Sequence, residues 1–128
     1  MKIMRKTQRC GFSTDLDEAT AKNLNYRKVL YTTPHMQLVL MRLVPGQQIG
    51  LEVHNEHSQF VKAEAGSGWA RVGKFLDELS PGESVIVPPG VKHNFWASND
   101  QPLSLYVLYA PPMHPIDTIQ KERPENEN

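Results

Sequence analysis

Side chains that can bind a divalent metal ion gather in two short stretches of the sequence. Glu52, His54 and Gln59 lie within residues 45–66, and His93 follows a Pro-Pro-Gly turn further along the chain. Residues i and i+2 of a strand project to the same face, so we expect Glu52 and His54 to point together. Two imidazoles, one carboxylate and one amide oxygen suit a divalent ion such as Mn, Fe, Zn, Ni or Co. Four such ligands leave positions open for water or substrate, as a catalytic metal site requires.

The same residues also admit an interpretation without a metal. Glu52, His54 and Gln59 would then lie in a solvated loop, and His93 would be a hydrogen-bonded residue at the rim of the fold. The spacing alone does not decide between the two interpretations. His57 lies between the candidate ligands and is a candidate acid or base, because the ordinary pKa of histidine is about 6.5. A solvated loop histidine is the simpler interpretation of His57.

The elements that position these side chains are predicted to be short strands. Turns containing proline, glycine or asparagine separate segments with an apolar or alternating pattern. We expect strands at residues 26–32, 36–44, 69–72, 75–79, 84–87, 93–97 and 103–109. Such a series is typical of an all-β sandwich or barrel, and two Pro-Gly turn-and-strand units, at Pro45 and Pro81, suit a jelly roll with two similar halves. A short helix at residues 15–22 is expected to precede the strands, since Thr14 and Asp17 have the spacing of a capping box.

Residues 36–44 are nearly all apolar, with Gln37 and Arg42 as exceptions. A strand with one buried face should alternate, so this run predicts a strand covered on both faces. In a domain this small we expect the second cover to be another subunit. The sequence therefore predicts a homodimer.

Length and charge restrict the class of protein. The chain of 128 residues is the size of one domain, and its 14 basic and 14 acidic residues balance. This balance argues against nucleic acid or an anionic membrane surface as the main partner. The N-terminal sequence lacks the apolar region of a secretory signal, and the single Cys10 fits a reducing compartment, so we expect a cytoplasmic protein. We divide the chain into an N-terminal arm with the helix (1–24), a barrel (25–116) and a disordered C-terminal tail (117–128).

The segment that carries the first three candidate ligands resembles the first sequence motif of the cupin superfamily. Aligned on Gly46, the motif places Glu52 and His54 at its two histidine positions. Gln59 falls at the glutamate position, and Gly66 at the final glycine. Two of the usual ligands are therefore exchanged.

The segment around His93 is similar to the second cupin motif. The matching positions are Gly82, Pro88, Gly90 and His93. Ala97 stands where the motif has asparagine, although Asn94 directly follows the histidine. The resemblance implies a double-stranded β-helix, the jelly-roll barrel of this superfamily.

The exchanged ligands are the normal set in a narrower group of single-domain cupins, commonly labelled mannose-6-phosphate-isomerase-like, which the chain resembles over residues 25–114. This resemblance implies that Glu52, His54, Gln59 and His93 hold a divalent metal ion, and that the chain is a dimer. It implies, as the leading function, a metal-dependent isomerase of a sugar or sugar phosphate. An Fe(II)-dependent oxygenase and a non-catalytic metal- or sugar-binding module are the alternatives.

Overall fold

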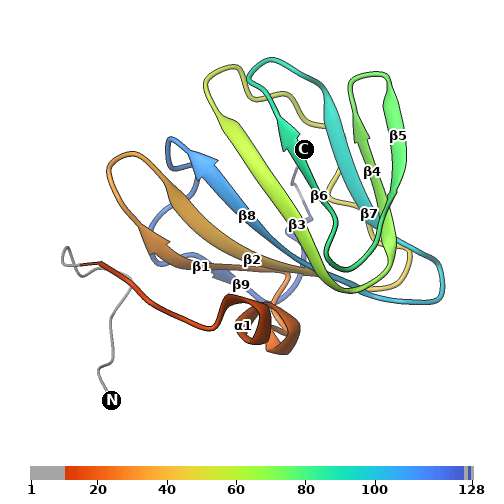
Figure 1. Cartoon of the computed structure of the whole chain (residues 1–128), viewed down its shortest axis with the longest axis horizontal. Coiled ribbons are helices and arrows are strands. Elements are labelled where there is room, and N and C mark those ends of the chain that lie inside the picture. Colours follow the sequence, from red (N-terminus) through yellow and green to blue (C-terminus); the bar gives the residue numbers. More distant parts are fainter. Residues whose placement is uncertain (1–10, 126, 128) are drawn as a thin grey trace.

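The computed structural model describes residues 11–125 and 127, and these residues form two antiparallel β-sheets and one helix (Figure 1). The elements are α1 (Leu16–Lys22), β1 (Arg27–Thr32), β2 (Gln37–Leu43), β3 (Ser58–Gly66), β4 (Gly68–Val72), β5 (Phe75–Leu79), β6 (Ser84–Val87), β7 (His93–Ala97), β8 (Leu103–Ala110) and β9 (Ile119–Gln120). The larger sheet has the strand order β6-β3-β8-β2-β1-β9, and the smaller has the order β5-β4-β7. The prediction of an all-β fold with one short helix is confirmed.

The two sheets face each other but are not closed into a continuous barrel. The segment before β3 pairs with β7 through two isolated bridges, Gln48 with Trp96 and Glu52 with His93. This segment therefore continues the smaller sheet beyond β7. The two predicted ligand segments lie side by side as a result.

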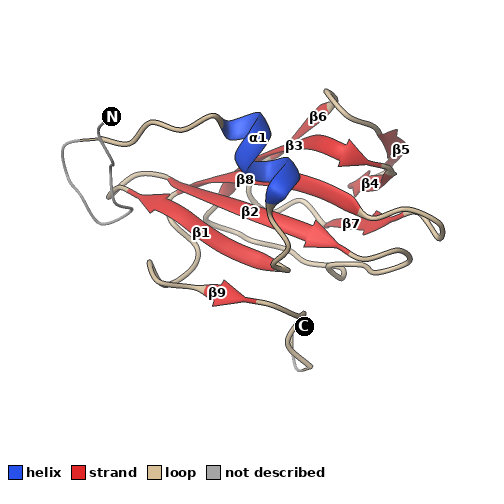
Figure 2. Ribbon diagram, turned by 90° about the horizontal axis from the view of Figure 1, so that it is seen from below, coloured by secondary structure: helices blue, strands red, loops and turns tan. Residues whose placement is uncertain are grey.

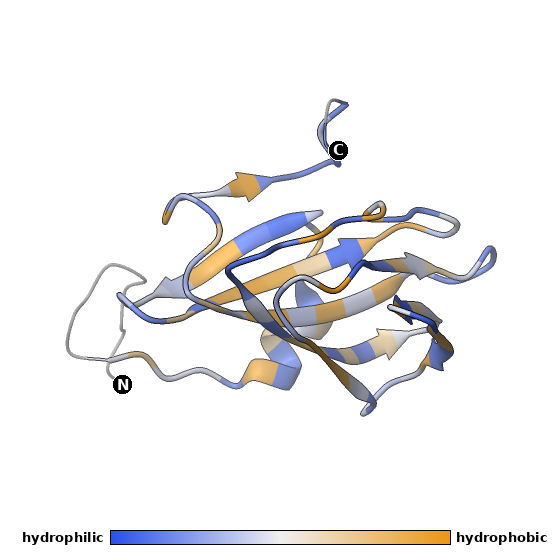
Figure 3. Cartoon of the chain, turned by 90° about the horizontal axis from the view of Figure 1, so that it is seen from above, coloured by the Kyte–Doolittle hydropathy of each residue, from blue (hydrophilic) through white to orange (hydrophobic). Residues whose placement is uncertain are grey.

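Alternating side chains of the strands build the core between the sheets. Val39, Met41 and Leu43 of β2 are fully buried there, and hydropathy alternates along the strands (Figure 3). Tyr26, Phe95 and Leu105 belong to the same buried cluster. This packing is the arrangement expected for two sheets with apolar inner faces.

The outer face of β2 has a different cover from the one we expected. Leu40 points away from the core cluster yet is buried. It lies by a pocket that residues of the helix segment, Ala19 and Asn23 among them, also line. Helix α1 lies over this side of the larger sheet (Figure 2). At Leu40 the second cover thus comes from the same chain, so the apolar run at 36–44 does not by itself require another subunit.

Helix α1 begins one residue later than the capping-box prediction implied. Asp15, not Thr14, is the N-cap, and its carboxylate accepts a hydrogen bond from the Glu18 amide at 3.1 Å. Aspartate is a stronger N-cap residue than threonine, which accounts for the shift by one residue. The helix ends at Lys22 with Asn23 as C-cap, as predicted.

The described part of the segment 117–128 lies against the larger sheet. Ile119–Gln120 form β9, which pairs antiparallel with β1. Glu127 forms an ion pair with the buried Arg27 at 2.8 Å. The sheet thus extends past residue 116, while the expected arm at residues 1–10 lies outside the described residues. None of the helical structure in the described part of the chain is long and apolar enough to cross a membrane.

Gly66 provides a test of the close approach between β3 and the turn before β8. Its φ is +83°, and a Cβ atom there would lie 1.7 Å from the carbonyl oxygen of Pro102. We expect Gly66→Ala to lower the free energy of unfolding by roughly 3–5 kcal/mol, because backbone strain and a clash with backbone add. Urea denaturation measures the change.

Gly82→Ala is the matched control. Its φ is +90°, but no atom lies within 4 Å of the added Cβ. Only the conformational cost of about 1–2 kcal/mol should remain. Equal losses for the two variants would contradict the close approach at Gly66.

Candidate metal centre

Backbone pairing brings the two ligand segments together. The amide of Glu52 donates to the carbonyl of His93, and the amide of His93 donates to the carbonyl of Glu52, both at 2.9 Å. The side chain of Asn94 accepts from the amide of Gly50 at 2.8 Å. The carbonyl of His54 accepts from the amide of Gly90 at 2.9 Å. These bonds fix the backbone on both sides of each candidate ligand.

Three predicted ligands form a cluster. One ligand atom from each of Glu52, His54 and His93 lies within 4.8 Å of the other two. His54 Nε2 is 3.5 Å from Glu52 Oε1, and the rings of His54 and His93 have centroids 5.2 Å apart. Glu52 and His54 point together as the strand period predicts, although only an isolated bridge forms at Glu52.

Gln59 completes the predicted set from the other sheet. It lies near the start of β3, its side chain is buried, and its Nε2 is 3.0 Å from Nε2 of His93. In this orientation the amide donates a hydrogen bond to the imidazole. A half-turn of the amide presents the oxygen in the same position, because the two ends of the group have nearly the same shape. The structure thus brings all four predicted residues together.

The histidines carry the features of metal ligands. The Nδ1 of His93 lies 2.8 Å from the carbonyl oxygen of Val91, so Nδ1–H donates and Nε2 keeps its lone pair. Metal-bound histidines usually have such an outer hydrogen bond. Burial and the neighbouring His93 lower the pKa of His54, although Glu52 acts to raise it. A lowered pKa favours the neutral imidazole, which is the form that binds a metal ion.

The donor set therefore fits a divalent ion. Two nitrogen donors and one carboxylate converge in a half-buried to buried position, and the Gln59 amide adjoins them. Nitrogen and oxygen donors of this kind suit the borderline and harder divalent metals. The chain has a His/Glu cluster that can bind a metal ion.

His57 lies at the edge of this cluster. Its ring centroid is 6.1 Å from that of His54, and its Nε2 is 3.2 Å from the carbonyl oxygen of Pro112. The ring is thus tethered, unlike a freely solvated loop histidine. Its role as acid or base stays a prediction.

Sequence reasoning missed the residues behind Gln59. Tyr109 pairs with Gln59 across β3 and β8, and the ring of His114 packs edge-on against Tyr109 at 5.3 Å. His114 Nε2 is buried and has no hydrogen-bond partner among the described residues. Burial, with the charge of Arg27, lowers the pKa of His114 to about 4.

Gln37 holds the loop that carries His114. Its Oε1 accepts from the amides of Met113 and His114 at 3.1 and 2.9 Å, and its Nε2 donates to the carbonyl of His114 at 2.7 Å. Gln37 is fully buried in a strand that is otherwise mostly apolar. A polar residue inside an apolar run was the available signal, since a buried amide requires partners.

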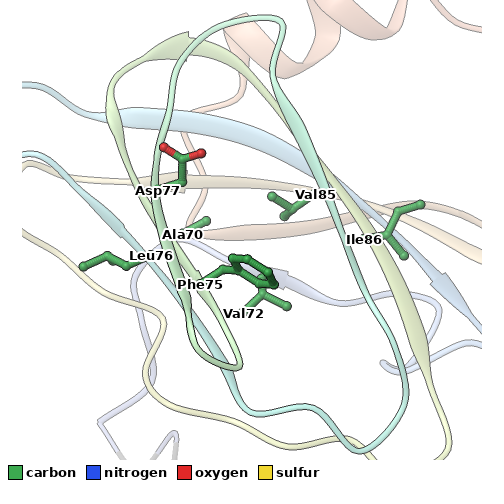
Figure 4. Close-up of a pocket in the computed structure, with 7 residues that line it drawn as sticks. All are labelled: Ala70, Val72, Phe75, Leu76, Asp77, Val85 and Ile86. Carbon is green, nitrogen blue, oxygen red and sulfur yellow. The ribbon is translucent and has the colours of Figure 1, made fainter.

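An apolar pocket of about 320 Å³ lies apart from the metal cluster (Figure 4). Its lining residues are Ala70, Val72, Phe75, Leu76, Asp77, Val85 and Ile86. They come from β4, β5 and β6, and include none of the predicted ligands. This pocket does not contribute to the candidate metal centre.

Comparison with known proteins defines the class. Residues 39–109 match the family model described as Cupin domain, and this stretch includes all four predicted ligands. The chain belongs to the cupin family, and its fold is the double-stranded β-helix predicted from the motifs. The assignment to a mannose-6-phosphate-isomerase-like group is not part of this finding.

Particular relatives extend the similarity over most of the chain. It is 36% identical over 118 residues to the protein YrkC of Bacillus subtilis. The aligned region covers 88% of this chain and 63% of YrkC. It is 36% identical over 127 residues to the protein L612 of Acanthamoeba polyphaga mimivirus, covering 96% and 79% of the two chains. The crystal structure of BH2720 from Bacillus halodurans has a TM-score of 0.87 and 31% identity, covering 92% of this chain and 94% of that one. The chain thus spans less than two thirds of YrkC.

Replacement of the histidine ligands tests the metal centre. His54→Ala and His93→Ala should each abolish stoichiometric binding of a divalent ion, because each removes one of a few nitrogen donors. Elemental analysis after reconstitution without chelator measures the metal content. His35→Ala, in an exposed turn, is the control and should keep the metal. Unchanged stoichiometry in both ligand variants would refute the site.

Proposed function

We propose that the chain is a metal-dependent enzyme that acts on a small polar molecule, with isomerisation of a sugar or sugar phosphate as the leading reaction. The observation that supports it is the cluster of Glu52, His54, Gln59 and His93 with His57 beside it. The similarity of these ligands to the mannose-6-phosphate-isomerase-like group supports the choice of substrate. An ion such as Zn, Mn, Fe, Ni or Co held there would supply a Lewis acid for a carbonyl or hydroxyl oxygen.

His57 has the position of the acid–base residue in this proposal. Its Nε2–H donates to the carbonyl of Pro112, which leaves Nδ1 with a lone pair. Nδ1 can accept a proton from one carbon of an aldose or ketose and return it to the adjacent carbon. The tether to Pro112 restricts rotation of the ring during this transfer.

An Fe(II)-dependent oxygenase is the second candidate. Glu52, His54 and His93 are two histidines and one carboxylate, which is the set that many non-haem Fe(II) oxygenases use. Gln59 is an additional donor that this set does not need. This difference favours the isomerase over the oxygenase.

The isomerase proposal predicts proton exchange. Metal-loaded protein should exchange the C1 or C2 proton of fructose 6-phosphate and mannose 6-phosphate with D2O, followed by NMR. His57→Gln should lower kcat by roughly 100-fold or more, because it removes the base, with metal content unchanged. His35→Gln is the control and should keep full activity.

Two other outcomes are informative. Oxygen consumption by the Fe(II)-loaded protein across a substrate panel, without proton exchange, would replace the isomerase by the oxygenase. Metal binding without either reaction would favour a non-catalytic binding module.

We also propose that the protein is cytoplasmic, which the single Cys10 supports. We propose further that it is a homodimer, which exposed apolar side chains support. Phe75, Leu76 and Ile86 are 80%, 50% and 67% exposed and lie around the pocket in Figure 4. An exposed apolar patch of this kind is typical of an interface. Light scattering should give about twice 14.5 kDa, and Phe75→Asp should shift the mass to that of the monomer. Leu24→Asp, at an exposed residue after α1, should leave the dimer intact, and a monomeric wild type would contradict the proposal.

A further inference from the structure

An arginine lies on the inner face of the larger sheet. Arg27 is at the start of β1, its partner across the sheet is the core residue Met41, and it is 4% exposed. Arg27 and Val29 alternate with the partly exposed Lys28, so both point between the sheets. A buried guanidinium requires an anionic or polar partner to offset its lost hydration.

Arg27 has two partners: Nη1 donates to Oε1 of Gln120 at 2.6 Å, and the guanidinium faces a carboxylate in a geometry that recognises that group. Nη1 of Arg27 donates to Oε1 of Glu127 at 2.8 Å, and Nη2 donates to Oε2 at 3.2 Å. The hydroxyl of Tyr26 donates to the same Oε2. The side chain of Arg27 is 5% exposed, and that of Glu127 is 13% exposed. Two parallel N–H donors match a planar carboxylate more closely than a lone ammonium group would.

The donors belong to the larger sheet, whereas the acceptor belongs to the segment that follows it. Tyr26 directly precedes β1 and Arg27 is its first residue, whereas Glu127 comes after the two-residue strand β9. Its turn is held by Arg123, which donates to the carbonyls of Ile49 and Glu127 at 2.9 and 3.0 Å. In Figure 1 the segment after β9 runs on the side of the larger sheet away from α1. Glu127 is therefore a tethered carboxylate inside a site that the sheet provides.

Tyr109 is the cross-strand partner of Gln59 of the metal cluster, and the ring of His114 packs against Tyr109 at 5.3 Å. Nε of Arg27 and Nε2 of His114 are buried and have no hydrogen-bond partner among the described residues. Both are polar atoms that a bound molecule can satisfy.

We propose that Tyr26 and Arg27 form a binding subsite for the carboxylate of a small organic acid, and that Glu127 occupies this subsite as an internal competitor. The ligand class is a small molecule with a planar carboxylate. The subsite goes beyond the proposed function, since its residues hold no metal and its occupancy does not depend on any reaction.

Propionate is the probe, because it has the carboxylate and the short stem of a glutamate side chain. Propionate is titrated into the full chain and into Glu127→Ala, and NMR chemical shifts report binding. We expect Glu127→Ala to bind at least about tenfold more tightly, because a tethered group competes at an effective concentration in the millimolar range. Glu125→Ala is the matched control, exposed on the same segment, and should bind as the wild type does.

Substitution of the donors locates the binding. In the Glu127→Ala background, Tyr26→Phe should weaken propionate binding by about fivefold or more, since it removes one hydrogen bond to a charged group and keeps the ring. Arg27→Lys should weaken it further, because the paired donors are lost. A cooperative thermal transition shows that each variant is folded, and Tyr26→Phe decides where Arg27→Lys does not fold.

Several results would overturn the proposal. These are affinity in Glu127→Ala no higher than in the wild type, propionamide binding as tightly as propionate, and unchanged affinity after substitution of Tyr26. Tighter binding of inorganic phosphate than of propionate would likewise reject a carboxylate subsite. Loss of isomerase activity in His57→Gln bears only on the proposed reaction, so the two proposals fail separately.

Discussion

The two-way backbone pairing of Glu52 and His93 is the contact on which the metal centre depends. It joins two residues that are far apart in the sequence. Each amide nitrogen lies 2.9 Å from the carbonyl oxygen of the other residue. The direction of each side chain then follows from its backbone: Glu52 and His54 by their spacing, and His93 from the start of β7. Gln59 arrives from the opposing sheet. The site thus requires both sheets, and any change that separates them separates the ligands.

Much of this arrangement could be predicted, because local rules govern it. Turn residues marked the strand ends, and the two-residue period predicted that Glu52 and His54 would point together. The segment before His93 ended in a turn, so a new strand had to begin there. The resemblance to the cupin motifs added that Gln59 would face the same point, which spacing alone left open.

The remaining features depend on contacts that no local pattern encodes. Arg27 and Glu127 are 100 residues apart in the sequence yet form an ion pair. Nothing in the polar sequence around Glu127 indicates that this carboxylate is buried. The burial of Leu40 under α1 likewise depends on how a helix packs, which the apolar run could not distinguish from a subunit contact. Asp15 rather than Thr14 is the N-cap, in line with the higher capping preference of aspartate, and the capping-box spacing did not reveal this.

The interior carries charges of both signs, and their separation limits what can bind there. The pKa of Glu127 is lowered: burial acts to raise it, but hydrogen bonds from Arg27 and Tyr26 outweigh burial, so this carboxylate stays ionised beside its partner. Glu52 lies with the imidazoles of His54 and His93 in the metal cluster. A cation is therefore favoured near Glu52 and an anionic group near Arg27.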